Sequence, residues 1–312
     1  MKLEVDRMNR ICYKMGELTG MGVLDDAAAR RNSLLYRREI QAMPGIVSLQ
    51  LAPEAIYGQE KHAQVELLLR RYCVLEPCER DVDSSVKSLP EENVLRERGS
   101  GEGDGWEKEA ASDIKRMDWY THIEGSYLFF RKMKKQGASG LQMDEELVNW
   151  SIRLNQFFRK RGLLQIYYVP FARYLICSDW EAALEDGAFW PSCYLGVLET
   201  ALQNTCEEIV GAARLQRSAI TAISSEKNSQ LLFDILSYIE ETPVFGIKEV
   251  AETFQVAFNT ASKMIRILED HQLVGEISRK PRYRLYYYEK YVREYGGGNE
   301  IRDRIPMAGR GT

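Results

Sequence analysis

The spacing of hydrophobic and polar residues predicts helices over the first part of the chain. Over residues 2–75 apolar side chains recur with a helical period, and Ala, Leu, Arg and Glu predominate. A first long segment stops at Pro44, and a second starts near Pro53, where proline suits the first turn of a helix. We therefore predict long helices over residues 16–43 and 53–75.

The helical pattern is interrupted between residues 79 and 115. This stretch is highly charged, and four glycines between residues 99 and 105 nearly alternate with other residues. Such a segment buries too little apolar surface to offset its ordering entropy, so we predict a long, partly disordered surface loop. No Lys-Ser or Lys-Thr pair follows the glycines, which argues against a phosphate-binding loop.

Helical patterning returns over residues 116–224. Two segments end in basic turns followed by Gly137 and Gly162, which is typical of helix C-termini. Asp144, Glu145 and Glu146 crowd the start of the second segment, where negative charge favours the helix dipole. Residues 1–78 and 116–224 are therefore predicted to be almost purely helical.

The pattern changes again over residues 225–295. The sequence predicts a close succession of six elements: an amphipathic helix, a short extended piece, a two-turn helix, a tight turn, a third helix, and a pair of strands in which apolar and polar residues alternate. This is the element order of a winged helix-turn-helix domain. We predict a mainly α fold, in which a helical domain precedes a winged helix with a small β-hairpin wing. Residues 296–312 are predicted to be a disordered tail.

The third helix of this domain carries candidate DNA contacts. Its inward positions are predicted to be Ala261, Met264, Ile265 and Leu268, which leaves short polar and basic side chains outside. Such side chains suit base edges and phosphates, and the basic wing suits phosphates. The candidate DNA-binding residues are Asn259, Thr260, Ser262, Lys263, Arg266, Arg279, Lys280, Arg282 and Arg284.

Two features of the same domain weigh against DNA. Residues 245–295 contain nine lysines and arginines against seven acidic residues, so the local positive charge is small. Gln255 and Ala257 stand where a glycine and a Ser or Thr cap are common in such turns. A winged helix that serves packing or self-association therefore stays open as an alternative.

Composition and charge limit which kinds of function remain open for this chain. The 312-residue chain has a formal net charge of -4, so any basic surface must be local. Its six cysteines and three histidines are scattered without zinc-ligand spacing, and we predict neither a metal site nor a cofactor. The start "MKLEVDRMNR" lacks the apolar segment of a secretory signal, and no apolar run approaches a membrane span. We expect a cytoplasmic protein without membrane contact.

Several stretches share the motifs of one protein family. In the C-terminal domain these are "LVGEIS" and "LYYYEKYV", and upstream they are "RKRGLLQIYYVPFARYL", "WEAALEDG" and "FWPSCYLGVLETALQ". The first pair resembles the winged-helix tail of many bacterial Fic (Fido) family proteins. The upstream stretches resemble the region after the Fic active site, and "YRREIQAMPGIVS" is similar to the helix that carries the family's autoinhibitory glutamate.

The residues that carry Fic chemistry are mostly replaced. The resemblance implies that residues 1–78 and 116–224 are the N-terminal and C-terminal parts of one Fic-like domain. Enzymes of this family transfer AMP or a related group to a hydroxyl side chain, using the motif H-P-F-x-D/E-G-N-G-R. The matching place is "GLQMDEELV", residues 140–148. Gly140 replaces the general-base histidine, Val148 the phosphate-holding arginine, and Val47 the inhibitory glutamate. Asp144 alone matches, at the acidic position, so a base and phosphate-directed donors are missing.

Three hypotheses follow from these observations. The first is a Fic-like protein with a degenerate active site that acts as a DNA-binding or regulatory protein, as a homodimer if it binds DNA. The second is a protein-interaction module without DNA binding. The third is a Fic-type AMP transferase with an altered site, in which Asp144, Glu145 or Glu146 would replace the missing base. The loss of the motif favours the first two over an enzyme.

Overall fold

The computed structural model describes residues 2–23, 25–59, 61–72, 110–137, 140–278 and 283–294. Over these residues the fold is mainly α, with one small antiparallel sheet, as the hydrophobic pattern predicts. The predicted disordered tail and residues 79–109 of the predicted loop lie outside the described residues. No described helix is both long enough and apolar enough to cross a bilayer.

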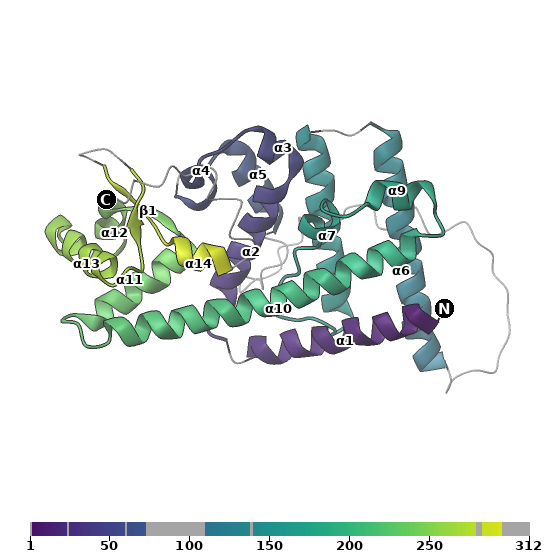
Figure 1. Cartoon of the computed structure of the whole chain (residues 1–312), viewed down its shortest axis with the longest axis horizontal. Coiled ribbons are helices and arrows are strands. Elements are labelled where there is room, and N and C mark those ends of the chain that lie inside the picture. Colours follow the sequence, from purple (N-terminus) through teal and green to yellow (C-terminus); the bar gives the residue numbers. More distant parts are fainter. Residues whose placement is uncertain are drawn as a thin grey trace, which may run out of the picture.

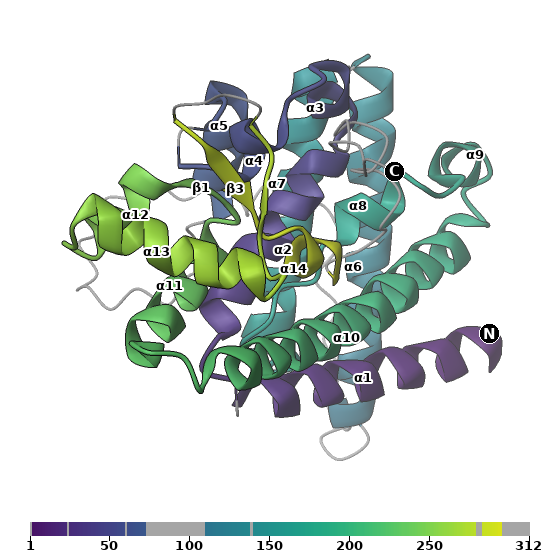
Figure 2. The same ribbon diagram turned by 60° about the vertical axis from the view of Figure 1, so that its left-hand side comes forward.

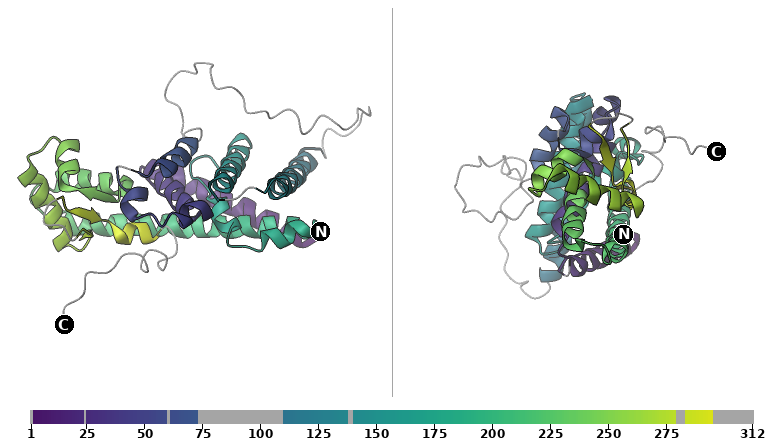
Figure 3. Two further views of the ribbon diagram at one scale, coloured as in Figure 1. Left: turned by 90° about the horizontal axis from the view of Figure 1, so that it is seen from above. Right: turned by 90° about the vertical axis from the view of Figure 1, so that its left-hand side faces the viewer.

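A helical body forms the larger part of the molecule (Figure 1). It contains α1 (Lys2–Val23), α2 (Ala28–Ala42), α3 (Pro44–Ser48), α4 (Pro53–Tyr57), α5 (Ala63–Tyr72), α6 (Ala110–Lys135), α7 (Gly140–Lys160), α8 (Phe171–Leu175), α9 (Trp180–Glu185) and α10 (Trp190–Ile223). The long helix α10 runs along the molecule with α1 packed beside it, and leads from the body into the C-terminal domain (Figures 1 and 3).

The two long helices predicted near the N-terminus are each divided. Between α1 and α2 the carboxylate of Asp25 accepts a hydrogen bond from the Ala27 backbone N–H at 3.0 Å and one from the Tyr167 hydroxyl. Between α4 and α5 stands Gly58, where a Cβ would lie 2.5 Å from the Glu54 carbonyl oxygen. The sequence pattern thus predicts continuous helices, but tertiary contacts interrupt the first and a tight backbone turn interrupts the second.

The predicted loop also ends earlier than the sequence pattern indicates. Helix α6 begins at Ala110, so residues 110–115 are helical rather than part of a loop that reaches residue 115. The sequence there, "AASDIK", contains two alanines, the strongest helix formers. The helix therefore extends back into the charged stretch.

A buried acid joins the elements of the body. Glu39 on α2 is fully buried and accepts hydrogen bonds from the Tyr72 hydroxyl at 2.7 Å and the Ser151 hydroxyl at 2.7 Å. The Tyr168 hydroxyl and the Ala172 backbone N–H also donate to it. Burial raises the pKa of Glu39, and these hydrogen bonds act in the opposite direction. One side chain thus connects α2 with α5, α7 and the start of α8.

His122 on α6 has a structural role in the helical body. His122 on α6 stacks on Phe157 with ring centroids 4.4 Å apart, and its Nε2 lies 3.0 Å from the Tyr194 hydroxyl oxygen. Burial lowers the pKa of His122 to about 4, so the ring is neutral at physiological pH. These contacts make His122 part of the aromatic core.

The C-terminal domain has the predicted element order. It contains α11 (Ser229–Glu241), β1 (Val244–Gly246), α12 (Ile247–Thr253), α13 (Phe258–Asp270), β2 (Gly275–Glu276), β3 (Leu285–Tyr287) and α14 (Glu289–Glu294). The strands form an antiparallel sheet in the order β1-β3-β2, with Phe245 opposite Tyr286 and Glu276 opposite Tyr286 on the other side. This is a winged helix, although its strands are shorter than the sequence pattern suggests.

Helix α14 is absent from the predicted elements and lies against α10. Gly211 on α10 lies beside the Glu294 side chain of α14, whose flexible carboxylate end is the group nearest to it. Tyr288 and Tyr291 stack at 5.2 Å and are buried at this contact. The wing strand β3 thus leads directly into a helix that fastens the winged helix to the body.

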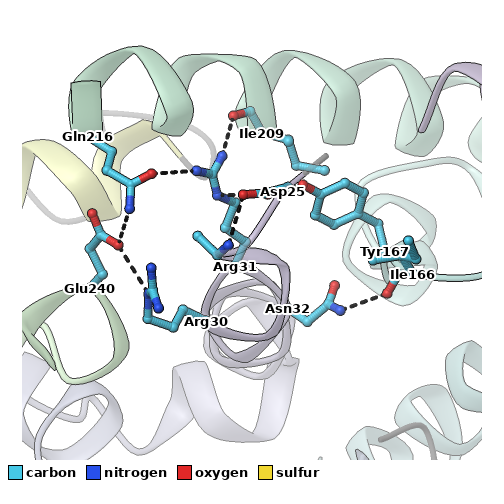
Figure 4. A network of polar contacts seen from close by, with 10 residues as sticks. Asp25, Arg30, Arg31, Asn32, Ile166, Tyr167, Ile209, Gln216 and Glu240 are labelled. Carbon is cyan, nitrogen blue, oxygen red and sulfur yellow. Dashed lines mark hydrogen bonds and ion pairs between the residues drawn. The ribbon is translucent and has the colours of Figure 1, made fainter. Parts of the chain in front are cut away.

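A second junction connects the winged helix to α2 (Figure 4). Glu240 on α11 is fully buried, 3.3 Å from the Arg30 Nε, and accepts a hydrogen bond from the Gln216 Nε2 at 3.0 Å. Arg31 donates to Gln216 at 2.9 Å and pairs with Asp25 at 3.1 Å. These contacts join α2, α10 and α11.

This junction predicts a pH dependence of stability. Burial raises the pKa of Glu240 from 4.5 to about 7, against the pull of Arg30 and Arg31. Because the folded-state pKa lies above the unfolded value, the contribution of Glu240 to stability is greatest below pH 4.5 and is lost as the pH rises from 4.5 through 7. Between about pH 5.5 and pH 8 the wild type should therefore lose about 2 kcal/mol more than Glu240→Gln.

Urea unfolding of both proteins across this pH range measures the difference. The glutamine is a matched control, because it keeps the shape of the side chain and cannot ionise. A gap between the two proteins that does not change with pH would contradict the assignment of the titration to Glu240.

Candidate nucleic-acid interface

One face of α13 is buried and the opposite face is open. Ala261, Met264, Ile265 and Leu268 are at most 1% exposed, as predicted, and pack into the core of the winged helix. On the opposite face Asn259, Lys263 and Arg266 are exposed, and the half-buried Thr260 and Ser262 lie at its margins. Spacings of four and three residues place the three exposed side chains in one stripe along the helix.

The two cations of this stripe are available for a ligand. Within the described ranges, neither Lys263 nor Arg266 forms a hydrogen bond or ion pair with another residue. Lys248 on α12, by contrast, lies 3.5 Å from the Glu252 carboxylate. Lys263 also has no acidic residue three or four positions away on α13, whereas Arg266 has Glu269 and Asp270 at these positions, so Lys263 is the better placed of the two for a phosphate or a base edge.

Charge is distributed unevenly along α13. Lys263 and Arg266 occupy its middle, whereas Glu269 and Asp270 are exposed at its C-terminal end. A polyanion would be attracted to the N-terminal and middle turns and repelled from the last one. The positive charge of α13 therefore lies in its middle turns and the negative charge at its C-terminal end.

The wing contributes one described candidate. Arg284 is exposed, and its guanidinium lies 3.5 Å from the Glu276 carboxylate on the neighbouring strand. Part of its charge is thus balanced before any ligand binds. Arg279, Lys280 and Arg282 lie outside the described residues. Tyr283, beside Arg284, is 84% exposed.

Helix α13 is easy to reach from outside. It lies with α12 at the end of the molecule opposite the N-terminus of α1 (Figure 1), and Figure 2 shows the same pair at the periphery. The helical body lies on the other side of the winged helix in both views. The end of the winged helix that carries α12 and α13 therefore lies away from the helical body.

The turn before α13 contains a strained residue. Gln255, at the position where glycine is common, has a φ of +53°. A side chain in this left-handed region costs about 1 kcal/mol or more, whereas glycine adopts it freely. Gln255→Gly should therefore raise the free energy of unfolding by about 0.5 to 1 kcal/mol.

Urea unfolding measures this effect, with Gln203→Gly in the middle of α10 as the control. Glycine inside a helix should cost about 1 kcal/mol, so the two substitutions should have opposite signs. Equal destabilisation by both would show that the side chain of Gln255 stabilises the turn.

The place that corresponds to the Fic motif is closely packed. Residues 140–148 form the first turns of α7, and α3 lies against them. The carboxylate of Asp144 is fully buried and accepts hydrogen bonds from the Gly45 and Ile46 backbone N–H groups, each at 2.9 Å. A Cβ at Gly45 would lie 2.5 Å from the Asp144 Oδ2 and 2.7 Å from the backbone of Leu141, so only glycine allows this approach.

Of the three carboxylates proposed as a replacement base, two have structural partners. Asp144 holds α3, and Glu145 pairs with the Arg71 guanidinium at 2.8 Å. Glu146 is half-buried. Gly140 begins the helix with a φ of +56° and provides no group that could accept a proton.

No other chemical centre emerges from the part of the chain that the structure describes. No group of three His, Cys, Asp or Glu residues in that part is placed to hold a metal ion. A surface groove of about 590 Å³ lies between α1 and α10 and is lined by Asn9, Arg10, Tyr13, Lys14, Glu199, Thr200, Gln203 and Asn204. Neither α7 nor α13 contributes a residue to it.

Sequence reasoning missed one exposed residue of α13. Phe258 is the first residue of the helix and is 55% exposed, whereas the pattern assigns it to the preceding tight turn. Phe258 stands three and seven residues before the buried Ala261 and Ile265, so helical spacing alone would place it on the buried side and gives no signal of its exposure.

Comparison with known proteins does not assign this chain to a group. No protein-family model and no curated protein matches it. The function must therefore be inferred from the residues themselves.

Proposed function

We propose that this protein is a DNA-binding regulatory protein that binds duplex DNA through its winged helix. The observation that carries the proposal is the outer face of α13, where Asn259, Lys263 and Arg266 are exposed in one stripe. An amide and two cations on one helix face are the groups that read base edges and neutralise phosphates in the major groove. The second helix of a helix-turn-helix motif is the element that enters this groove.

A local basic stripe is sufficient for this role despite the net charge of -4. Affinity for DNA comes mainly from the few cations that replace condensed counterions at phosphates. The acidic end of α13 also orients the helix, because Glu269 and Asp270 would be repelled by the backbone of the duplex. The charge pattern thus supports entry of the N-terminal turns.

In this proposal the helical body is a Fic-like scaffold without catalysis. Fic chemistry needs a base and donors that point at a pyrophosphate. Here the N–H groups of Gly45 and Ile46 donate to Asp144, so they do not face a free anion site. The buried charge of Asp144 would in addition repel a phosphate.

Because one winged helix buries little surface on DNA, we further propose that the protein binds as a homodimer. Two α13 helices would then contact half-sites on the same face of the duplex. Sedimentation of the protein with a duplex would give the stoichiometry, and a one-to-one complex would contradict this part of the proposal.

Selection from a randomised duplex pool tests the proposal. The full-length protein should enrich a short motif over several rounds, because base contacts discriminate by about 1 to 3 kcal/mol each. A pool that stays random, or a protein that retains no duplex, would contradict it. ATP in equilibrium dialysis serves as the control for the enzyme hypothesis, and we expect no bound nucleotide.

A further inference from the structure

The central helix α2 contains a buried arginine without an acidic partner. Arg37 is 6% exposed, and its Nη1 donates a hydrogen bond to the Tyr57 carbonyl oxygen at 3.0 Å. Its Nε is buried without a hydrogen-bond partner, and no carboxylate of the described residues forms an ion pair with it. Arg31 on the same helix, by contrast, is paired with Asp25 at 3.1 Å. Buried charges in proteins are normally paired, so the guanidinium of Arg37 keeps the capacity to bind an anion.

The remaining nitrogens of Arg37 have the geometry of an oxyanion site. The Tyr57 carbonyl uses Nη1, which leaves Nε and Nη2 without a partner among the described residues. These two nitrogens lie on the same edge of the planar guanidinium, and their parallel N–H groups match two oxygens of a phosphate or a carboxylate. The guanidinium can therefore hold an oxyanion through two hydrogen bonds and keep the one that it already makes.

A second cation lies beside Arg37. Helix α2 packs against α4 and α5 (Figure 2), and Lys61 stands in the connection between these two helices, with its Nζ 3.4 Å from the Gln59 carbonyl oxygen. Burial, and then the charge of Arg37, lower the pKa of Lys61, so the two cations are close enough to repel each other. An anion held between them would remove this repulsion.

The acidic residues of the neighbourhood do not neutralise the two cations. Glu66 and Glu241 attract Lys61, but both are exposed. Glu66 pairs with Arg70 at 2.7 Å, and Glu241, at the end of α11, forms no ion pair within the described part of the chain. The charge of a phosphate monoester is about −1.5 to −2 near pH 7, which matches two cations better than a single carboxylate does.

We propose that Arg37 and Lys61 form a binding site for a single phosphate group between α2 and the connection of α4 to α5. The free edge of the Arg37 guanidinium would bind two phosphate oxygens, and Lys61 would bind a third. The site lies where the body meets the winged helix, because the Gln59 Nε2 donates to the Tyr238 hydroxyl on α11 at 3.4 Å. This inference goes beyond DNA binding and does not depend on it.

Isothermal titration calorimetry of the full-length protein with inorganic phosphate, at constant ionic strength, tests the proposal. Glycerol 3-phosphate in the same series distinguishes a site for free phosphate from a site for a phosphate ester. Arg37→Gln and Lys61→Gln should each raise the dissociation constant about tenfold or more, because each removes charge-assisted hydrogen bonds. Glu241→Gln should lower it about twofold, because this carboxylate attracts the same two cations and repels the anion.

Lys248→Gln is the matched control, because Lys248 is exposed on α12 and its loss changes the net charge by the same amount. It should leave the dissociation constant unchanged. Urea unfolding without phosphate checks the fold of each variant, and Lys61→Gln with Glu241→Gln decides the question if Arg37→Gln does not fold. Absence of saturable phosphate binding, or binding that these two substitutions leave unchanged, would overturn the inference. Acetate that binds as tightly as phosphate would also contradict it.

Discussion

Replacing both Lys263 and Arg266 by alanine is expected to weaken binding to duplex DNA about 30-fold or more. Each cation contributes about 1 kcal/mol or more if it contacts a phosphate or a guanine. Both side chains are exposed, so the substitutions should leave the free energy of unfolding nearly unchanged. Fluorescence anisotropy measures the affinity, and urea unfolding checks that the fold is intact.

The matched control removes two other cations. Lys132 and Lys135 are exposed on α6, at the far end of the molecule from α13 (Figure 1). Their joint replacement by alanine changes the net charge by the same amount and should reduce affinity only a few-fold. A similar loss for both double variants would mean that total charge, rather than the face of α13, determines binding.

Glu39→Ala is expected to have the largest effect on stability, a loss of about 4 to 5 kcal/mol. The substitution leaves the hydroxyl groups of Tyr72, Tyr168 and Ser151 buried without their acceptor, and each unsatisfied group costs about 1 to 3 kcal/mol. The Ala172 N–H still donates to the Ser151 Oγ. The substitution also removes the desolvation cost of the buried carboxyl group, which is the cause of its raised pKa, and this offsets part of the loss in stability. Urea or thermal unfolding at neutral pH measures the change.

Two further variants separate the hydrogen bonds from other causes. Glu39→Gln keeps the shape and one acceptor oxygen, so we expect a loss of about 2 kcal/mol. Glu185→Ala removes a side chain that is 75% exposed and pairs with Lys134, and should cost less than about 1 kcal/mol. A loss below about 1 kcal/mol for Glu39→Ala would show that the donors find other partners.

The winged helix is the part of the fold that the sequence predicts best. Its apolar residues follow a strong helical period, and the inward set Ala261, Met264, Ile265 and Leu268 is buried as predicted. Short-range spacing decides such amphipathic faces. The exposed positions of Asn259, Lys263 and Arg266 follow from the same periodicity, since residues opposite a buried stripe must face solvent.

The contacts that connect the elements cannot be predicted from the sequence in the same way. Glu240 and Arg30 lie 210 residues apart in sequence, and no local pattern brings them to 3.3 Å. Asp144 and Gly45 likewise meet only because α3 folds onto α7. Sequence patterning predicts which face of an element is buried, but it does not identify the polar groups that meet across the interface.

Helix α14 illustrates a different difficulty. The sequence pattern predicts a wing strand that ends at Glu289, the first residue of α14, because Tyr286, Tyr287 and Tyr288 favour strands. The helix exists because Tyr291 and Val292 bury against the body. A helix this short is marginal by itself, so tertiary packing decides it.

The salt dependence of DNA binding tests the central claim most directly. Anisotropy of the full-length protein would be measured with the duplex upstream of its own gene and with a random duplex, each at about 50 mM and 200 mM salt. Release of counterions from at least a few phosphates predicts an affinity at least about tenfold lower at the higher salt, and tighter binding to the upstream duplex. Absence of binding to either duplex at the lower salt would contradict the account, and would leave α13 as a packing or protein-interaction surface.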